Sequence, residues 1–132
     1  MNRGNLVIVS APGDYGKPRP AVVVQSDWLS ANDSVLVALC TSTVLDAPFY
    51  RLDLAPSEAH GLKAPTQVMV DKIVAMPREK CGAIIGRLDE REIAVLNHML
   101  AVVIGIADGP KPKRDRPPRY GKARVGKARL GS

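Results

Sequence analysis

The 132-residue sequence lacks the residue clusters on which most metal-dependent and covalent catalysis depends. Its two histidines, His60 and His98, are isolated and have no neighbouring ligand at a metal-binding spacing. Its two cysteines, Cys40 and Cys81, form no Cys-x-x-Cys pair, which fits a reducing compartment and small apolar side chains in a core. There is no Walker-type phosphate loop and no Gly-x-Ser-x-Gly nucleophile elbow. We therefore expect any catalysis to need neither a metal ion nor a cofactor.

Long hydrophobic runs are also missing from the chain. The early apolar run, Leu6 to Val9, is too short for the hydrophobic region of a signal peptide. No other run approaches the length of a membrane-spanning helix. We expect a cytoplasmic protein that does not enter a membrane.

Positive charge is scarce over most of the chain and concentrated at its end. Residues 1–108 hold ten Lys and Arg against twelve Asp and Glu, a net charge of −2, whereas residues 109–132 hold nine against one, a net charge of +8. The second segment is rich in Pro and Gly and has no hydrophobic period, which predicts one folded domain over 1–108 and a disordered basic tail over 109–132. Such a tail commonly contacts nucleic acid, although a solubilising or artificially added extension explains its composition equally well.

Short apolar or alternating segments separated by Gly and Pro predict strands. A helix follows, because Asp89 and Glu92 have the spacing of a capping box before apolar residues at helical intervals. Both faces of this helix are fairly apolar, so we expect one face to pack on the sheet and the other against a further surface, with a dimer interface as one candidate. The pattern predicts a mainly β fold, a small curled antiparallel sheet or partly open barrel with a C-terminal helix. The expected strands are residues 6–9, 21–25, 35–40, 50–54, 67–75 and 81–85.

Arg19 lies between Pro18 and Pro20, directly before the apolar strand Ala21–Gln25. Each proline restricts its own backbone and that of the residue before it, so the arginine is held in a stiff, extended segment. A guanidinium in such a place suits a planar anion such as phosphate. On this stretch alone, the simpler interpretation of a surface arginine in a proline-rich turn is favoured.

Further polar residues stand at or near strand ends, namely Thr41, Ser42, Thr43 and Asp71. Together with Arg19 they fit RNA cleavage by attack of a ribose 2′-hydroxyl on its own phosphate. That reaction needs a group to take the 2′ proton, a group to protonate the leaving 5′ oxygen, and positive charge on the phosphorane. The three hydroxyls are equally explained by ordinary turn chemistry, and the sequence alone does not show that these residues converge.

Several ordered blocks between residues 3 and 106 resemble the MazF/PemK family of toxin ribonucleases from bacterial toxin–antitoxin modules. They are Arg3-Gly4, the segment Gly16-Lys17-Pro18-Arg19-Pro20 with the valines after it, Thr41-Ser42-Thr43, Ala47-Pro48-Phe49, Gly61-Leu62 with Gln67 to Lys72, and Gly86-Arg87-Leu88. The resemblance implies an SH3-like (PemK/CcdB-like) barrel that forms a homodimer and is neutralised by a cognate antitoxin. It also implies metal-independent cleavage of single-stranded RNA that leaves a 2′,3′-cyclic phosphate.

The resemblance also assigns roles to particular residues. Arg19 matches the catalytic arginine of the family, and Thr41 matches its catalytic threonine. Asp71 falls where some members carry an acidic residue proposed as the base. Lys17, Ser42 and Thr43 are expected to bind RNA. Two alternatives remain, a non-cleaving barrel that poisons a protein target such as gyrase, and an RNA-binding module driven by the basic tail.

Overall fold

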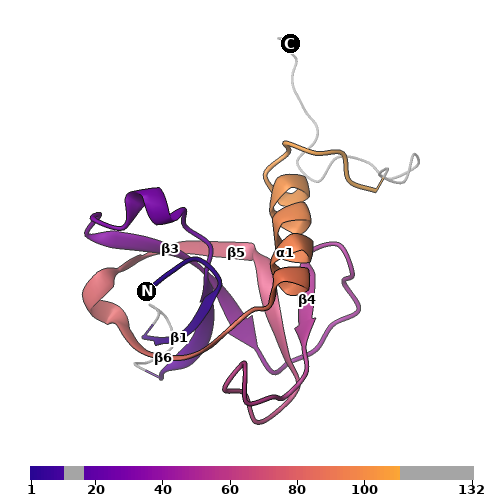
Figure 1. Cartoon of the computed structure of the whole chain (residues 1–132). Helices are drawn as coiled ribbons and strands as arrows, with labels where there is room; N and C mark the ends of the chain where they lie inside the picture. The colour runs from indigo at the N-terminus through magenta and orange to yellow at the C-terminus, as the bar shows by residue number, and fades with distance from the viewer. Residues whose placement is uncertain (11–16, 111–132) are drawn as a thin grey trace, which may run out of the picture.

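The computed structural model describes residues 1–10 and 17–110 (Figure 1). The expected turn before Arg19 lies mostly outside these ranges, as does the basic tail from residue 111 onward. The predicted strands and helix are confirmed within them, with shifts of one to several residues at their ends. The elements are β1 (Asn5–Val9), β2 (Arg19–Val23), β3 (Ser34–Thr41), β4 (Arg51–Leu54), β5 (Thr66–Pro77), β6 (Cys81–Arg87), α1 (Glu90–Val103) and the short 3-10 helices η1 (Asp27–Leu29) and η2 (Arg78–Lys80).

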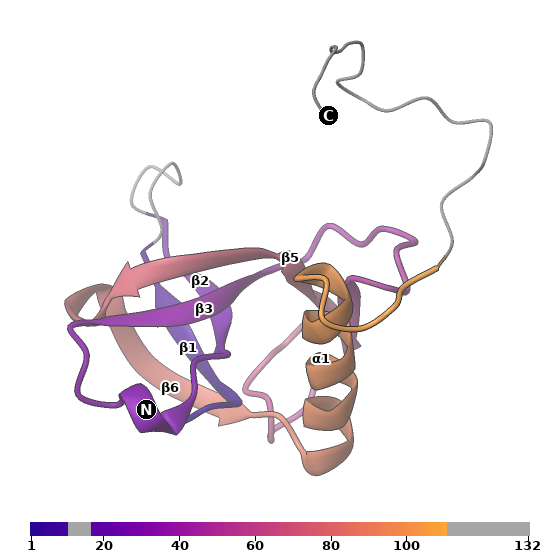
Figure 2. The ribbon, with the colours of Figure 1, turned by 90° about the horizontal axis from the view of Figure 1, so that it is seen from above.

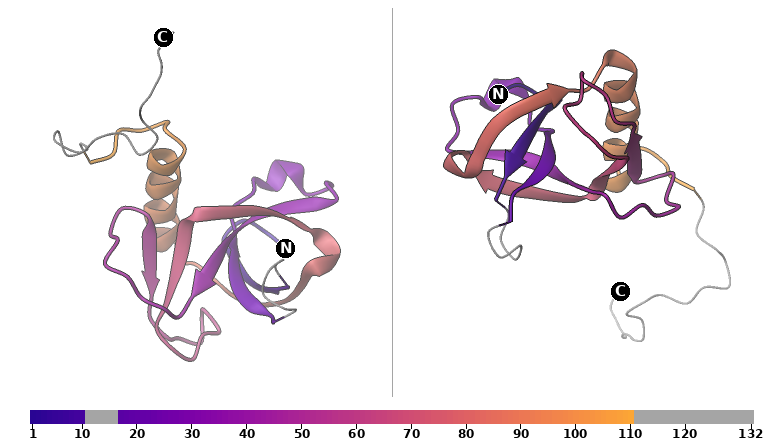
Figure 3. Two further views of the ribbon diagram at one scale, coloured as in Figure 1. Left: turned by 180° about the vertical axis from the view of Figure 1, so that it is seen from behind. Right: turned by 90° about the horizontal axis from the view of Figure 1, so that it is seen from below.

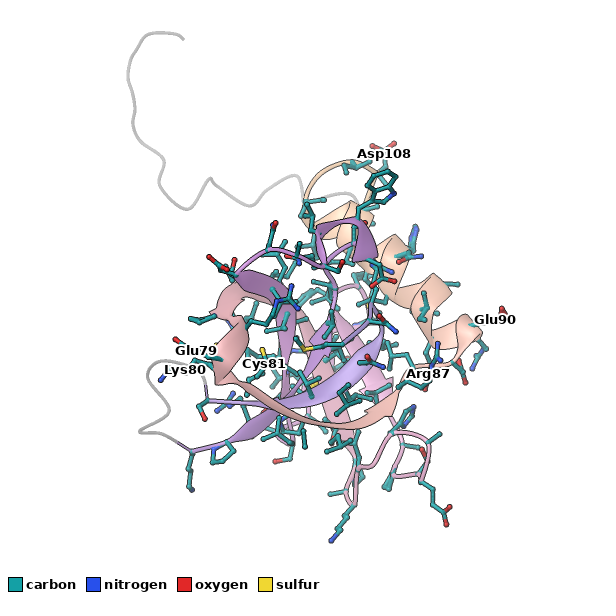
Figure 4. The ribbon with its side chains drawn as sticks, turned by 60° about the vertical axis from the view of Figure 1, so that its left-hand side comes forward. Glu79, Lys80, Cys81, Arg87, Glu90 and Asp108 are labelled. Atoms are coloured by element: carbon teal, nitrogen blue, oxygen red, sulfur yellow. The ribbon has the colours of Figure 1, made fainter. Side chains whose placement is uncertain are left out.

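The six strands form one antiparallel sheet in the order β4-β5-β3-β2-β1-β6. Only the three residues of η2 connect β5 to β6, although these strands stand four places apart in the sheet. So short a connection requires the sheet to curl until the end of β5 meets the start of β6 (Figure 2). The side chains of Glu79, Lys80 and Cys81 mark this meeting point (Figure 4). The predicted curled antiparallel sheet is confirmed.

The two faces of the curled sheet build two hydrophobic clusters. Alternate residues of a strand point to opposite faces, so Leu6 and Val22 join one cluster while Val7 and Val23 join the other. The cluster inside the curl is completed by Val9, Ala21, Val35, Val37 and Met76. Strands covered on both faces explain why these segments are almost continuously apolar.

Helix α1 covers the outer cluster and stands beside β4 and β5 (Figure 3). The predicted capping box is present, because the Asp89 carboxylate accepts from the Glu92 N–H (2.8 Å) and the Glu92 carboxylate accepts from the Asp89 N–H (2.9 Å). Leu96 and Met99 are buried against the sheet, whereas Val95 lies on the exposed side of the helix. In residues 1–10 and 17–110, no helix has the length and apolar character needed to span a membrane.

The connection between β4 and β5 folds onto the outer edge of β6. The Arg87 N–H donates to the Ala59 carbonyl at 2.9 Å, and backbone meets backbone so closely that a Cβ at Gly86 would overlap the Ala59 and His60 carbonyl groups. A Cβ at Gly61, where φ is +72°, would overlap the Ile85 carbonyl oxygen. The two glycines therefore allow this loop to cover a strand edge that would otherwise be open.

Candidate active site

The entrance of β2 and the exit of β3 form a groove of about 340 Å³. Antiparallel pairing explains this meeting, because the register that sets Ala21 opposite Leu39 places Arg19 level with Thr41 when it is continued by two residues. On the other side of β3, Thr41 pairs with Gln67, which brings the start of β5 to the same place. The groove is lined by Lys17, Pro18, Arg19, Pro20, Cys40, Thr41, Ser42, Thr43 and Thr66.

Five of the six predicted site residues therefore line one groove, and Asp71 is not among the lining residues. Asp71 is exposed on β5, where the pairing with β3 shifts register. Cys40 pairs with Val68 and Ala38 pairs with Ile73, so residues 69–72 of β5 face only one residue of β3. Asp71 stands four residues along β5 from Gln67, the residue that pairs with Thr41, and it is not among the residues that line the groove.

Cys40 lies in the wall of the groove beside the positive charge of Arg19. Burial raises the pKa of the Cys40 thiol to about 12, and the nearby Arg19 charge offsets this only in part. The thiol is therefore protonated at neutral pH and cannot act as a nucleophile or base there. This agrees with its expected role as a small buried side chain.

The Thr41–Thr43 segment forms a turn closed by a side chain. The Thr43 N–H donates to Thr41 Oγ1 at 3.1 Å, which uses the threonine oxygen as an acceptor. The hydroxyl proton of Thr41 is then available to donate to a group in the groove. Such a donor, together with the Arg19 guanidinium, provides a site for a phosphate group.

Two buried polar residues behind this turn were missed from the sequence. Alternation in 50–54 predicts a strand with one solvated face, which places Arg51 in water, yet its side chain is buried. Gln67 is buried as well, and the two side chains share a hydrogen bond between Arg51 Nη1 and Gln67 Oε1 at 3.1 Å. Arg51 and Asp53 are two residues apart, so strand alternation predicts that both side chains point to the same, solvated face. The burial of Arg51 comes from a loop whose position only the structure shows.

The pair Arg3-Gly4 is not among the residues that line the groove, and it connects the start of β1 to the end of β2. Arg3 Nε donates to the Val24 carbonyl at 2.9 Å, and the Gly4 N–H donates to the Val23 carbonyl at 2.8 Å. Gly4 has a φ of +90°, which favours glycine there. This block is structural. Within the part of the chain that the structure describes, no three His, Cys, Asp or Glu side chains come together as metal ligands would.

A model of the PemK-like, MazF-like toxins of type II toxin–antitoxin systems matches residues 2–104. The chain belongs to this family. It is also 37% identical over 108 residues to the "Probable endoribonuclease MazF" of Mycolicibacterium smegmatis, a match that covers 81% of this chain and 99% of that protein. The resemblance seen in the sequence is thereby confirmed.

Solved structures share the fold of this MazF/PemK-family chain. An endoribonuclease in complex with its cognate antitoxin from a mycobacterial species has a TM-score of 0.68 at 20% identity, covering 85% of this chain and 99% of that chain. The toxin MazF-mt6 of Mycobacterium tuberculosis has a TM-score of 0.67 at 20% identity, covering 76% and 96%. A MazE–MazF structure from Deinococcus radiodurans has a TM-score of 0.64 at 18% identity, covering 80% and 95%.

These matches distinguish between the functions that the sequence alone left open. Family membership makes the chain a toxin of a type II toxin–antitoxin system and a homologue of MazF endoribonuclease. The gyrase-poisoning alternative is not favoured by them.

Proposed function

We propose that this toxin cleaves single-stranded RNA, including mRNA, at short sequence motifs without a metal ion. The observation that carries the proposal is the groove in which strand register brings Arg19 level with the hydroxyl of Thr41. A rigid guanidinium and an oriented hydroxyl are suited to binding a phosphate whose charge increases in the transition state.

In the proposed reaction, the ribose 2′ oxygen forms a bond to the adjacent phosphorus as its proton leaves. The bond from phosphorus to the 5′ oxygen then breaks, and that oxygen takes up a proton, which leaves a 2′,3′-cyclic phosphate and a 5′-hydroxyl. Arg19 stabilises the phosphorane charge and can protonate the leaving oxygen, while Thr41 donates to a phosphate oxygen. Lys17, Ser42 and Thr43 bind the RNA around them. The assignment of Asp71 as the base rests on the family resemblance alone, since this side chain does not line the groove.

The proposed partners follow from the family and from the surface of the domain. A cognate antitoxin would neutralise the toxin by lying over the RNA groove, and toxin–antitoxin complexes are among the structural neighbours. We propose a homodimer, because large apolar side chains stay exposed on the single chain, including Trp28, Phe49, Val95 and Ile104. The protein would act in the cytoplasm, where its RNA substrates are. The basic segment 109–132 would add phosphate contacts beyond the groove.

The test is incubation of the purified, antitoxin-free protein with a long single-stranded RNA in EDTA, alongside Arg19→Ala. Discrete fragments ending in 2′,3′-cyclic phosphate are expected from the parent and not from Arg19→Ala. Arg78→Ala is a matched control, because Arg78 follows β5 and is not among the residues that line the groove. Fragments formed equally fast by Arg19→Ala would refute the assignment. Intact RNA from the folded parent, with toxicity that survives Arg19→Ala, would restore the protein-poisoning alternative.

A further inference from the structure

Arg51 is a buried cation with an unusual set of partners. Its side chain is 9% exposed, and its guanidinium donates from Nη1 to the Thr43 carbonyl at 3.3 Å and to Gln67 Oε1 at 3.1 Å. Among residues 1–10 and 17–110 it forms no ion pair, and its Nε has no hydrogen-bond partner. A buried charge without a counter-charge lowers the stability of the folded protein. A contribution to stability therefore does not explain why an arginine occupies this position.

Gln67 fixes the same segment from a second direction. Its side chain is 2% exposed, and its amide pairs with both backbone groups of Leu45, Oε1 accepting from the N–H at 3.0 Å and Nε2 donating to the carbonyl at 2.9 Å. Nε2 also donates to Asp53 Oδ1 at 2.8 Å. The amide therefore uses two donors and two acceptor positions, counting its bond from Arg51, and is fully satisfied. The chain from Thr43 to Leu45 is thus held by two buried side chains.

This support reaches the groove through Thr43. The Thr43 carbonyl oxygen accepts a hydrogen bond from the Arg51 guanidinium, and the Thr43 N–H donates to Thr41 Oγ1 at 3.1 Å. The position of Thr43 therefore determines where the Thr41 hydroxyl lies in the groove. A displacement of about 1 Å at a reacting group can cost on the order of 100-fold in rate.

We propose that Arg51 is a positioning residue for RNA cleavage, which holds the Thr41 hydroxyl in place through Thr43. The inference rests on the proposed function, because it assumes that Thr41 acts on the scissile phosphate. The planar, forked guanidinium suits this role, since one rigid group joins the Thr43 carbonyl to the Gln67 amide. A lysine ammonium lacks that geometry.

The experiment compares Arg51→Met and Arg51→Lys with the parent in RNA cleavage, separating kcat from KM. Arg51→Met is expected to lower kcat about 10-fold or more and to change KM by less than about 3-fold, because positioning acts on the transition state. Arg51→Lys is expected to lose at least about 5-fold in kcat. Arg78→Met is the matched control. Arg78 also donates to a loop carbonyl, from Nε to Asn32 at 2.7 Å, and also has a buried guanidinium nitrogen without a partner.

A second measurement separates positioning from general destabilisation. In a Thr41→Val background the hydroxyl is gone, so Arg51→Met or Arg51→Lys should lower kcat no further. If either Arg51 substitution lowers kcat by the same factor with and without the Thr41 hydroxyl, or if Arg51→Lys cleaves like the parent, the proposal is overturned. Should Arg51→Met fail to fold, Arg51→Lys carries the same comparison.

Failure of the proposed function gives a different result. If the folded parent cleaves no RNA, the position of Thr43 is still measurable by its amide hydrogen exchange and chemical shift. Faster exchange at Thr43 in Arg51→Lys, with no change in Arg78→Met, would support the link from Arg51 to the turn. Unchanged exchange at Thr43 in Arg51→Lys would overturn it.

Discussion

His60 and Glu92 join the β4–β5 connection to the first turn of α1, with His60 Nε2 2.9 Å from Glu92 Oε2. The other ring nitrogen, Nδ1, lies 2.9 Å from the Ala55 carbonyl oxygen. Both partners are acceptors, so both ring nitrogens are best used as donors, and the protonated imidazolium is the form that fits. Burial of His60 lowers its pKa, but the hydrogen bonds to Glu92 and Ala55 and the charges of Glu92 and Asp89 outweigh burial and raise it.

This relationship predicts that stability falls as pH rises. The folded state holds the His60 proton more tightly than the unfolded state, whose pKa is near 6.5. The stabilisation is therefore complete below that value and is lost as pH rises through the raised folded pKa. Urea unfolding across this range should show a decline in the free energy of unfolding. His60→Gln should abolish this decline with pH and lower the free energy of unfolding at low pH by about 1.5–3 kcal/mol.

His98→Gln provides the control for that experiment. His98 lies exposed on α1, so the same substitution there controls for the loss of a histidine side chain as such. An unchanged slope in His60→Gln would show that another group carries the titration.

The close approach of the β4–β5 connection to β6 predicts a sharp difference between two glycines. In Gly86→Ala the new methyl group would overlap the backbone of Ala59 and His60, and backbone cannot yield as a flexible side chain does. We expect a loss of about 2–3 kcal/mol in the free energy of unfolding. Gly82, in the same strand, has its nearest neighbour, the Ile8 carbonyl oxygen, 3.4 Å from an added Cβ. Gly82→Ala should change stability by less than about 0.5 kcal/mol, and equal losses in the two variants would contradict the packing described.

The strands, the C-terminal helix and most of the residues that line the groove could be predicted from the sequence. Both predictions depend on local residue patterns and on the order of the strands along the chain. Arg19 and Thr41 stand at the entrance and exit of strands that pair with each other, so the register alone brings them together. Arg51 was misplaced because its burial comes from the loop after β3, which folds back over an apparently solvated strand position. Asp71 lies within β5, in agreement with the predicted strand 67–75, but the sequence did not show which residue of β3 it faces, because the register between these two strands is irregular.

The hydroxyl of Thr41 should matter far more to catalysis than to stability. Thr41→Val keeps the shape of the side chain and removes the donor in the groove, so kcat should fall about 100-fold, as for loss of one donor to a developing oxyanion. Thr41→Ser retains the hydroxyl and should stay within about 10-fold of the parent. Single-turnover cleavage measures the chemical step, and thermal unfolding measures the stability of each variant. Parental cleavage by Thr41→Val would remove this hydroxyl from the mechanism.

Removal of residues 111–132 should weaken the dependence of RNA binding on salt. Those residues hold nine Lys and Arg and one Asp, and the chain without them has a net charge of −2. Each cation that contacts a phosphate of single-stranded RNA adds about 0.7 to the slope of log affinity against log salt. If four of them engage, affinity for a long RNA should fall roughly 50-fold more between 50 and 200 mM salt in the parent than in the truncated protein. A chain with these nine residues changed to Gln should behave like the truncated protein. Identical salt slopes in all three would show that the segment makes no phosphate contacts and leave the groove as the whole RNA site.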